Sequence, residues 1–143
     1  MSIRLKACLW SLALFMPIMA CNCPTVWKLD LPSPDGAWLA TAQTEQCGRF
    51  GSAYVGTFVT LRKLDGTVNK GKPFAILDYP GGGPIQKSYV LSDSNAGGGV
   101  NLRMKWLTAQ HLEVDYSGTI EPNLQVVKFG GVDITLRQTS AEP

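Results

Sequence analysis

The sequence has few charged residues and a single histidine, and both shortages exclude classes of function. Only 17% of its 143 residues are charged and 45% are hydrophobic, which is typical of a folded globular domain and not of a disordered chain. The net charge of +2 comes from Arg4 and Lys6, because without them the 13 basic residues fall to 11, equal to the 11 acidic ones. The rest of the chain is therefore neutral, which argues against binding to nucleic acid.

Motifs of catalysis are also lacking. His111 is the only imidazole, and there is no Gly-x-Ser-x-Gly nucleophile elbow. The glycine clusters at 81–83 and 97–99 lack the Lys-Ser/Thr that a phosphate-binding loop needs at its fixed spacing, so we interpret them as flexible surface loops. Cys23 or Cys47 could act as a nucleophile, but cysteines of exported proteins usually pair. We expect a protein that is not an enzyme and that uses no cofactor.

The N-terminus has the pattern of an export signal. Arg4 and Lys6 precede an apolar run from Ala7 to Met19, which is shorter than the roughly 20 residues of a membrane-spanning helix but suits a signal peptide. The run ends in Ile18-Met19-Ala20-Cys21, which resembles the lipobox of bacterial lipoproteins. In that family the signal is cut before the cysteine, whose sulfur carries diacylglycerol and whose new amine is acylated. The resemblance implies a signal peptide at 1–20 and lipidation of Cys21, which would hold the protein at a membrane. The alternatives are an unlipidated secreted form and a buried helix formed by the first twenty residues.

The cysteine count agrees with this interpretation. Cys8 would leave with the signal peptide, and a lipid on Cys21 would leave Cys23 and Cys47 to form a disulfide in an oxidising periplasm. The alternative for this pair is two reduced thiols. Asn22 follows the lipobox, where lipoproteins retained in the inner membrane commonly have Asp. By that analogy we expect an outer-membrane anchor in the bacterial cell envelope, with the domain facing the periplasm.

The rest of the chain predicts an all-β domain. No window of a dozen residues shows a helical apolar repeat free of Gly or Pro, whereas short β-rich runs alternate with Gly, Pro, Asn and Asp clusters. The predicted strands are Trp27–Leu31, Trp38–Thr44, Ala53–Lys63, Phe74–Leu77, Lys87–Leu91, Val100–Trp106, Leu112–Tyr116, Leu124–Phe129 and Val132–Arg137. We expect an anchor and tether at 21–30 and a single domain at 31–143, folded as an antiparallel, meander-rich sandwich or small barrel.

The register of one hairpin can be predicted from both of its faces. A three-residue loop at Thr108–Gln110 would align hydrophobic residues on one face and opposite charges on the other. The predicted hydrophobic pairs are Trp106 with Leu112, Met104 with Val114, and Leu102 with Tyr116. The predicted charge pairs are Lys105 with Glu113 and Arg103 with Asp115.

A second hairpin turns at Gly130-Gly131. The turn would pair Phe129 with Val132 and Val127 with Ile134 on the apolar face. Lys128 would then face Asp133 on the other side. Hydrophobic and charge patterns again agree, as a correct register requires.

The one cluster that suggests a metal is His111-x-Glu113-x-Asp115. Alternation places all three side chains on one strand face, but neighbours on that face lie about 7 Å apart, too far for one ion without a bulge. The predicted register also gives both carboxylates a cationic partner. We therefore favour a solvated charged face and keep His111, Glu113 and Asp115 as weak metal candidates.

The aromatic residues suggest a binding groove or a core. Trp38 and Trp106 occupy alternating strand positions and are expected to be core anchors. Trp27 lies close to the anchor, and the sequence leaves both roles open for it.

Two resemblances involve the segment Ser33-Pro34-Asp35-Gly36. It looks like the hairpin of TolB-type β-propeller blades, although a single copy in a short chain cannot build a propeller. The wider pattern resembles a family of small uncharacterised bacterial exported proteins, from this turn through Cys47-Gly48 and Thr57–Arg62 to the Trp106 hairpin. That family has no established activity.

These observations lead to two functional hypotheses. The first is a lipid-anchored envelope β-domain with a binding or structural role, attached to the membrane through acylated Cys21. The second is an immunity, exclusion or inhibitor-type lipoprotein that blocks a toxic or incoming protein. Small size, a disulfide and glycine loops suit both, and either would have an envelope protein as a possible partner.

Overall fold

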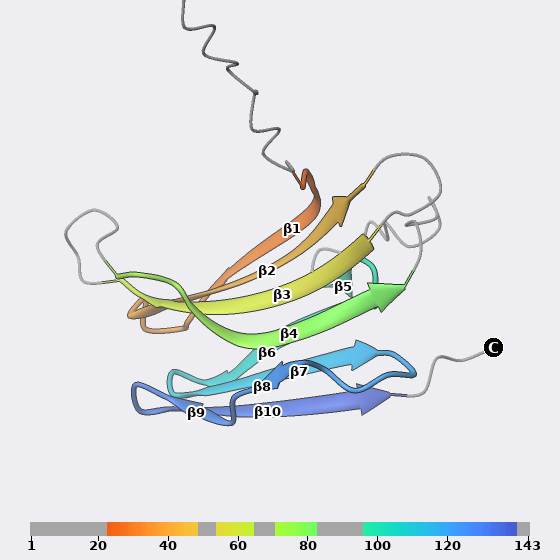
Figure 1. Ribbon diagram of the computed structural model, residues 1–143. Helices are drawn as coiled ribbons and strands as arrows, with labels where there is room; N and C mark the ends of the chain where they lie inside the picture. Colours follow the sequence, from red (N-terminus) through yellow and green to blue (C-terminus); the bar gives the residue numbers. More distant parts are fainter. Residues whose placement is uncertain (1–22, 49–53, 65–70, 83–95, 140–143) are drawn as a thin grey trace, which may run out of the picture.

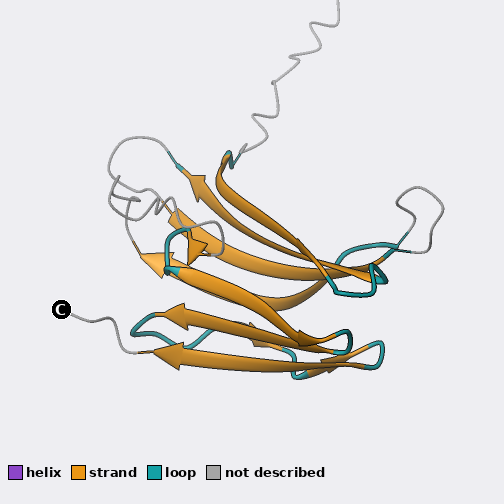
Figure 2. Cartoon of the chain, turned by 180° about the vertical axis from the view of Figure 1, so that it is seen from behind, coloured by secondary structure: helices purple, strands orange, loops and turns teal. Residues whose placement is uncertain are grey.

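The computed structural model describes residues 23–48, 54–64, 71–82 and 96–139. Their strands form two five-stranded sheets that pack face to face, which confirms the predicted all-β sandwich (Figures 1 and 2). The signal peptide at 1–20, Cys21 and the predicted strand Lys87–Leu91 lie outside the described residues. Within the described ranges, no helix has the length and apolar character needed to cross a bilayer.

The first sheet, sheet A, is mostly a meander. Its order is β1-β2-β3-β4-β8, and all of its neighbours are antiparallel. The strands are β1 (Thr25–Pro32), β2 (Trp38–Cys47), β3 (Tyr54–Lys63), β4 (Phe74–Gly82) and β8 (Leu124–Gln125). Strict alternation on β2 buries Trp38, Ala40 and Ala42 while the residues between them face outward.

The structure corrects the predicted tether at 21–30. Thr25–Asp30 belongs to β1, which pairs with β2 and is part of sheet A. The physical reason is that Trp27, Leu29 and Leu31 alternate toward the core and pack against it. The domain therefore includes Thr25–Asp30 of the predicted tether.

The second sheet, sheet B, contains both predicted hairpins. Its order is β5-β6-β7-β10-β9. The strands are β5 (Ala96–Gly97), β6 (Leu102–Thr108), β7 (His111–Ser117), β9 (Lys128–Phe129) and β10 (Val132–Thr139).

The β6–β7 register is confirmed at four pairs and differs at the turn. The confirmed pairs are Arg103 with Asp115, Met104 with Val114, Lys105 with Glu113, and Trp106 with Leu112. Thr108 pairs with His111 beyond a register shift, so a β-bulge and a tighter turn replace the predicted three-residue loop.

The Gly130-Gly131 hairpin is also confirmed. Phe129 lies opposite Val132, and Lys128 lies opposite Asp133 with 3.1 Å between the Lys128 Nζ and the Asp133 Oδ1.

Sheet B departs from the antiparallel pattern at one pair of strands. β7 and β10 run parallel, from His111 opposite Asp133 to Ser117 opposite Thr139. Parallel neighbours need a long connection, and the chain provides it by leaving β7 and passing through sheet A before it returns.

That connection explains why the predicted strand Leu124–Phe129 is split. Its first part, β8, pairs with β4 in sheet A, and its last part, β9, pairs with β10 in sheet B. Between them the Val126 N–H donates to the Ile76 carbonyl at 2.9 Å, while the Val127 carbonyl accepts from Ile134. The segment therefore hydrogen-bonds to both sheets along one side of the sandwich.

The core lies between the sheets and draws on both. Its buried members are Trp38, Ala40, Ala42, Val59, Leu61, Ile76, Leu77, Tyr79, Val100, Leu102, Met104, Leu112, Val114, Tyr116, Val132 and Ile134. Trp38 is confirmed as a core residue, and Trp27 and Trp106 pack against the core while half-buried. The Trp106 indole N–H also donates to the Leu31 carbonyl at 3.2 Å, which ties the two sheets together.

The turn at Ser33–Gly36 has a clear polar framework. Ser33 is buried, and its Oγ accepts from the Trp38 N–H at 2.9 Å and donates to the Asp35 carboxylate at 2.6 Å. Asp35 also accepts from the Ala37 N–H, and Gly36 has a φ of 68°. Hydrogen bonding from Ser33 and from the backbone holds the pKa of Asp35 below its usual value of 3.8.

Candidate functional site

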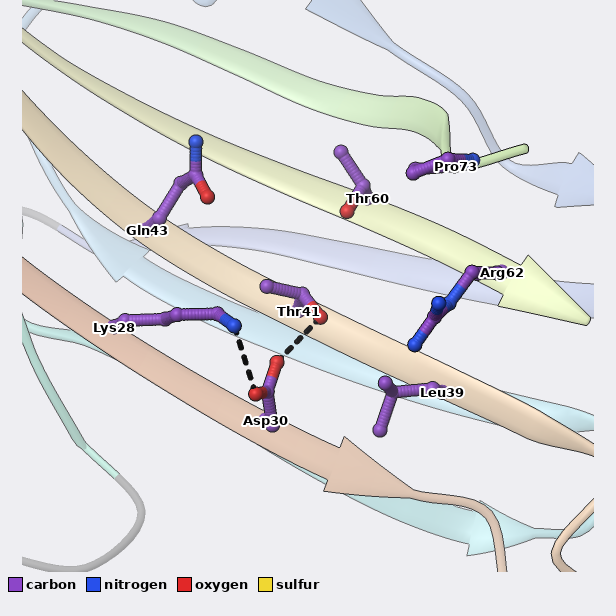
Figure 3. A pocket seen from close by; sticks show the side chains of 8 residues that line it. All are labelled: Lys28, Asp30, Leu39, Thr41, Gln43, Thr60, Arg62 and Pro73. Carbon is purple, nitrogen blue, oxygen red and sulfur yellow. Dashed lines mark hydrogen bonds and ion pairs between the residues drawn. The ribbon is translucent and has the colours of Figure 1, made fainter. Parts of the chain in front are cut away.

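The outer face of sheet A, which points away from sheet B, carries a polar depression of about 340 Å³. It is lined by Lys28, Asp30, Leu39, Thr41, Gln43, Thr60, Arg62 and Pro73. Figure 3 shows these side chains gathered over β1, β2 and β3. They lie there because alternation turns every residue that does not face the core toward this surface.

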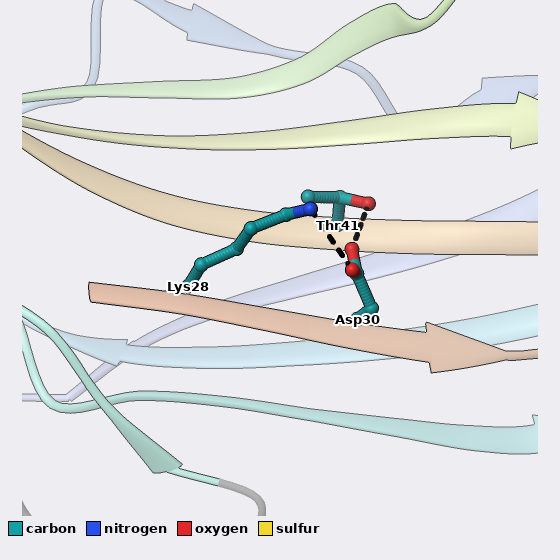
Figure 4. A network of polar contacts seen from close by, with 3 residues as sticks. All are labelled: Lys28, Asp30 and Thr41. Atoms are coloured by element: carbon teal, nitrogen blue, oxygen red, sulfur yellow. Dashed lines mark hydrogen bonds and ion pairs between the residues drawn. The ribbon is translucent and has the colours of Figure 1, made fainter. Parts of the chain in front are cut away.

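A network around Asp30 occupies one side of the depression (Figure 4). The Thr41 hydroxyl donates to Asp30 Oδ1 at 2.6 Å, and the Lys28 Nζ lies 2.9 Å from Asp30 Oδ2. Partial burial disfavours ionisation of Asp30, but these two contacts and the nearby positive charge of Arg62 outweigh it. The pKa of Asp30 therefore lies below its ordinary value, and the carboxylate is charged at neutral pH.

Arg62 differs from the other charged residues of the depression. It is half-buried, and no described carboxylate lies within 4.0 Å of its guanidinium. Figure 3 shows the guanidinium extending toward Leu39 and Thr41. The Thr60 hydroxyl makes no hydrogen bond with the described residues either. The depression thus contains two cations and one carboxylate, an excess of one positive charge.

Two aromatic rings lie farther along the same face of β3. Tyr54 is 42% exposed and Phe58 is half-buried, and both rings lean over Gly56. A Cβ built on Gly56 would lie 2.9 Å from the Phe58 ring and 3.0 Å from the Tyr54 ring, so a larger residue there would displace the rings. Beside them on β2, the Gln43 amide donates to the Glu45 carboxylate at 2.8 Å. Sheet A therefore presents rings, an amide and a guanidinium on one surface.

The outer face of sheet B contains the residues that were considered as weak metal ligands. The His111 ring nitrogen lies 2.8 Å from the Thr135 hydroxyl, and Glu113 forms an ion pair of 2.7 Å with Arg137 of β10. Glu113 thus pairs across the parallel strands and not with Lys105, the partner that the register suggested. Asp115 has a buried Oδ1 without a hydrogen-bond partner. The part of the chain that the structure describes contains no group of three or more His, Cys, Asp or Glu arranged to hold a metal.

The glycine cluster at 97–99 is not a free surface loop. The Gly99 N–H donates to Thr44 Oγ1 at 3.2 Å, and Thr44 shares a buried hydrogen bond of 3.0 Å with Thr57. Gly98 has a φ of 75°, and a Cβ there would lie 2.5 Å from Thr44 Oγ1 and 2.6 Å from the Trp27 ring. These contacts lock the turn against the inner face of sheet A.

A second hollow lies beside that turn. Its volume is about 280 Å³, and it is lined by Tyr79, Pro80, Gly81, Gly99, Val100 and the segment 117–120. The Tyr79 hydroxyl inside it accepts from the Ile120 N–H at 3.2 Å. This hollow contains no charged side chain, so we consider the depression on sheet A the better candidate for specific recognition.

The predicted disulfide is present. Cys23 and Cys47 are bonded, which joins a residue two positions before β1 to the last residue of β2. The bridge closes this end of the β1–β2 hairpin, where the Gln46 N–H also donates to the Pro24 carbonyl at 3.0 Å.

None of the residues lining the depression was identified as functional from the sequence. They could have been identified from the alternation of buried and outward-facing residues along each strand. Thr41 and Gln43 on β2, and Thr60 and Arg62 on β3, are the outward members of strands whose other members are buried. Their register across β2 and β3 then makes them neighbours.

Comparison with known proteins gives no relative: the chain matches no protein-family model, no curated protein and no solved structure. The resemblances of the lipobox and of the Ser33–Gly36 turn therefore stay predictions.

Proposed function

We propose that this chain is a lipid-anchored binding protein of the bacterial cell envelope, attached through Cys21 and without catalytic activity. The observation that carries the proposal is the Cys23–Cys47 disulfide. Of the four cysteines, Cys8 lies within the export signal, and the bridge engages two others. Cys21, the last residue of the lipobox pattern, is then the one cysteine of the proposed mature chain that lies outside the disulfide.

The bridge also limits the distance between anchor and domain. Cys21 and Cys23 are two positions apart, a span of at most about 7 Å in an extended chain. An acylated Cys21 would therefore hold the disulfide end of the sandwich against the membrane, and several acyl chains would make that attachment stable. The Ser33–Gly36 and Gly130-Gly131 turns lie at the opposite end, beside Trp38, and would point away.

The hydrogen-bond and ion-pair partners of the polar side chains favour binding over catalysis. His111 and Glu113 are engaged by neighbours on β10, whereas the Arg62 guanidinium and the Thr60 hydroxyl in the depression make no hydrogen bond or ion pair with the described residues. Such a surface is suited to holding a ligand by side-chain contacts.

The anchor is tested by the non-reduced intact mass of protein purified from membranes. We expect residues 21–143 plus acyl chains minus two hydrogens, and we expect Cys21→Ala to lose the acyl mass and leave the membrane fraction. Cys8→Ser is the matched control, because it removes a cysteine that the mature protein does not contain. An unmodified wild-type chain in the soluble fraction would refute the proposal.

The inhibitor hypothesis differs from the proposed binding role because it requires one specific protein partner. An inhibitor-type lipoprotein should capture one envelope or incoming protein at nanomolar affinity and protect the cell against it. If affinity purification from cells returned such a protein, and protection depended on it, inhibition would replace the binding role proposed here.

A further inference from the structure

We propose that the depression on the outer face of sheet A binds an acidic saccharide, with Arg62 and Thr60 holding its carboxylate and Phe58 stacking on a neighbouring sugar ring. This inference rests on the proposed function, since it names the ligand class of that binding domain. It is based on which polar side chains of this face already have hydrogen-bond or ion-pair partners and which have none among the described residues.

Arg62 is the charged residue of the depression that forms no ion pair with the described residues. Lys28 and Asp30 neutralise one another at 2.9 Å, and Thr41 donates to the same carboxylate. Arg62 is left with a positive charge and no described carboxylate within ion-pairing distance. On sheet B, by contrast, Arg137 pairs with Glu113 and Lys128 pairs with Asp133. Arg62 is half-buried and loses hydration, and Asp30 attracts its charge without forming an ion pair with it, so a ligand that brings one negative charge complements it.

The planar geometry of the Arg62 guanidinium favours a ligand with a carboxylate group. Guanidinium presents two parallel N–H groups that match the two oxygens of a carboxylate. Thr60 lies two residues before Arg62 on the same face of β3, and its hydroxyl can donate a third hydrogen bond. Leu39 and Pro73 provide apolar contact at the rim of the depression.

The rest of the face suits sugar rings. Phe58 lies four residues from Arg62, about 13 Å along the strand, a span comparable to a disaccharide. Gln43 lies opposite Phe58 in the register, and its Oε1 remains free to accept from a sugar hydroxyl while its Nε2 is bound to Glu45. The exposed Tyr54 ring extends the aromatic surface beyond Phe58.

A peptide ligand fits this surface less well. Peptides that add to a sheet use the free backbone groups of an edge strand. β2 and β3 are interior strands with hydrogen-bonded neighbours on both sides, so their backbone is already occupied. Recognition by the β2 and β3 residues of this face therefore uses side chains, and their hydroxyl, amide, guanidinium and aromatic groups are those that can bind a charged sugar.

The test titrates the full mature protein in detergent with a disaccharide that contains glucuronic acid, with its glucose counterpart and with inorganic phosphate. Calorimetry or NMR shifts provide the affinities. We expect the acidic disaccharide to bind best. Arg62→Gln should weaken that binding roughly 10- to 100-fold, which corresponds to the loss of hydrogen bonds to a charged group. Arg62→Lys should recover only part of the affinity, because it keeps the charge and loses the paired donors.

Two further variants locate the site. Phe58→Leu should weaken the acidic and the neutral disaccharide by similar factors, since it removes stacking and leaves Arg62 in place. Lys105→Gln removes an exposed cation from the outer face of sheet B and should leave all affinities unchanged. Near-UV circular dichroism shows whether each variant keeps its fold, and the Lys variant replaces Arg62→Gln if the latter does not fold.

Several results would overturn the inference. Equal affinity for the acidic and neutral disaccharides would exclude carboxylate recognition, and a preference for phosphate would indicate a general anion site. Absence of binding by folded wild-type protein would exclude a saccharide ligand. None of these affects the acyl mass on Cys21, so failure of the ligand class and failure of the anchor are told apart.

Discussion

Removal of the Cys23–Cys47 disulfide should destabilise the domain through its unfolded state. In the folded protein, the residues that follow Cys23 remain bound to β2 by backbone hydrogen bonds, including Gln46 N–H to the Pro24 carbonyl and the β1–β2 ladder. Replacing both cysteines by serine therefore leaves the native contacts in place. The unfolded chain, in contrast, loses a cross-link between residues 24 positions apart.

The expected size follows from the loop that the bridge closes. Loop-closure entropy for about 24 residues corresponds to about 3.5 kcal/mol at 25 °C. For a domain of roughly 120 residues, the unfolding entropy near the midpoint is about 0.25 kcal/mol per degree, so the loss lowers the melting temperature by about 10–15 °C.

The assay is urea and thermal unfolding of the mature protein, followed by tryptophan fluorescence and circular dichroism. Reductant should shift the wild type toward the double variant and leave the double variant unchanged. A loss below about 1 kcal/mol, with the same slope against urea, would refute the reasoning. It would mean that the bridge does not restrict the unfolded ensemble or that the β1 segment is not firmly part of the sandwich.

Two other predictions concern single turns. Gly98→Ala should lower the unfolding free energy by about 1–3 kcal/mol, because it combines a positive φ with contacts to a buried threonine and a tryptophan ring. Denaturant titration measures this loss, and Gly131→Ala is the comparison variant: its φ is 87° but a Cβ there meets nothing within 4 Å, so it should cost less. The charge of Asp35 should stabilise the domain above its unfolded pKa of 3.8, because the folded pKa is lower, and this contribution should disappear as the pH falls through the folded value. The difference in unfolding free energy between wild type and Asp35→Asn should therefore shrink as the pH falls below 3.8 and through the lower folded pKa, and an unchanged difference would contradict the assignment.

The sequence alone predicted features that depend on local periodicity. Alternation and turn residues predicted strands β1 to β4, the β6–β7 register and the Gly130-Gly131 hairpin, because successive residues of a strand face opposite sides of a sheet and residues two apart share a side. The cysteine count predicted the disulfide, because only two cysteines remained once Cys8 and Cys21 were assigned to export and lipid.

The tertiary structure alone decided what depends on contacts between distant segments. The parallel pairing of β7 with β10 and the crossing at 124–129 join strands whose sequences contain no signal for one another. The candidate site has the same origin. Lys28, Thr41 and Arg62 come from three strands, and their shared face exists only once β1, β2 and β3 have paired in register. Local pattern determines which way each side chain points, whereas the pairing of the strands determines which side chains meet.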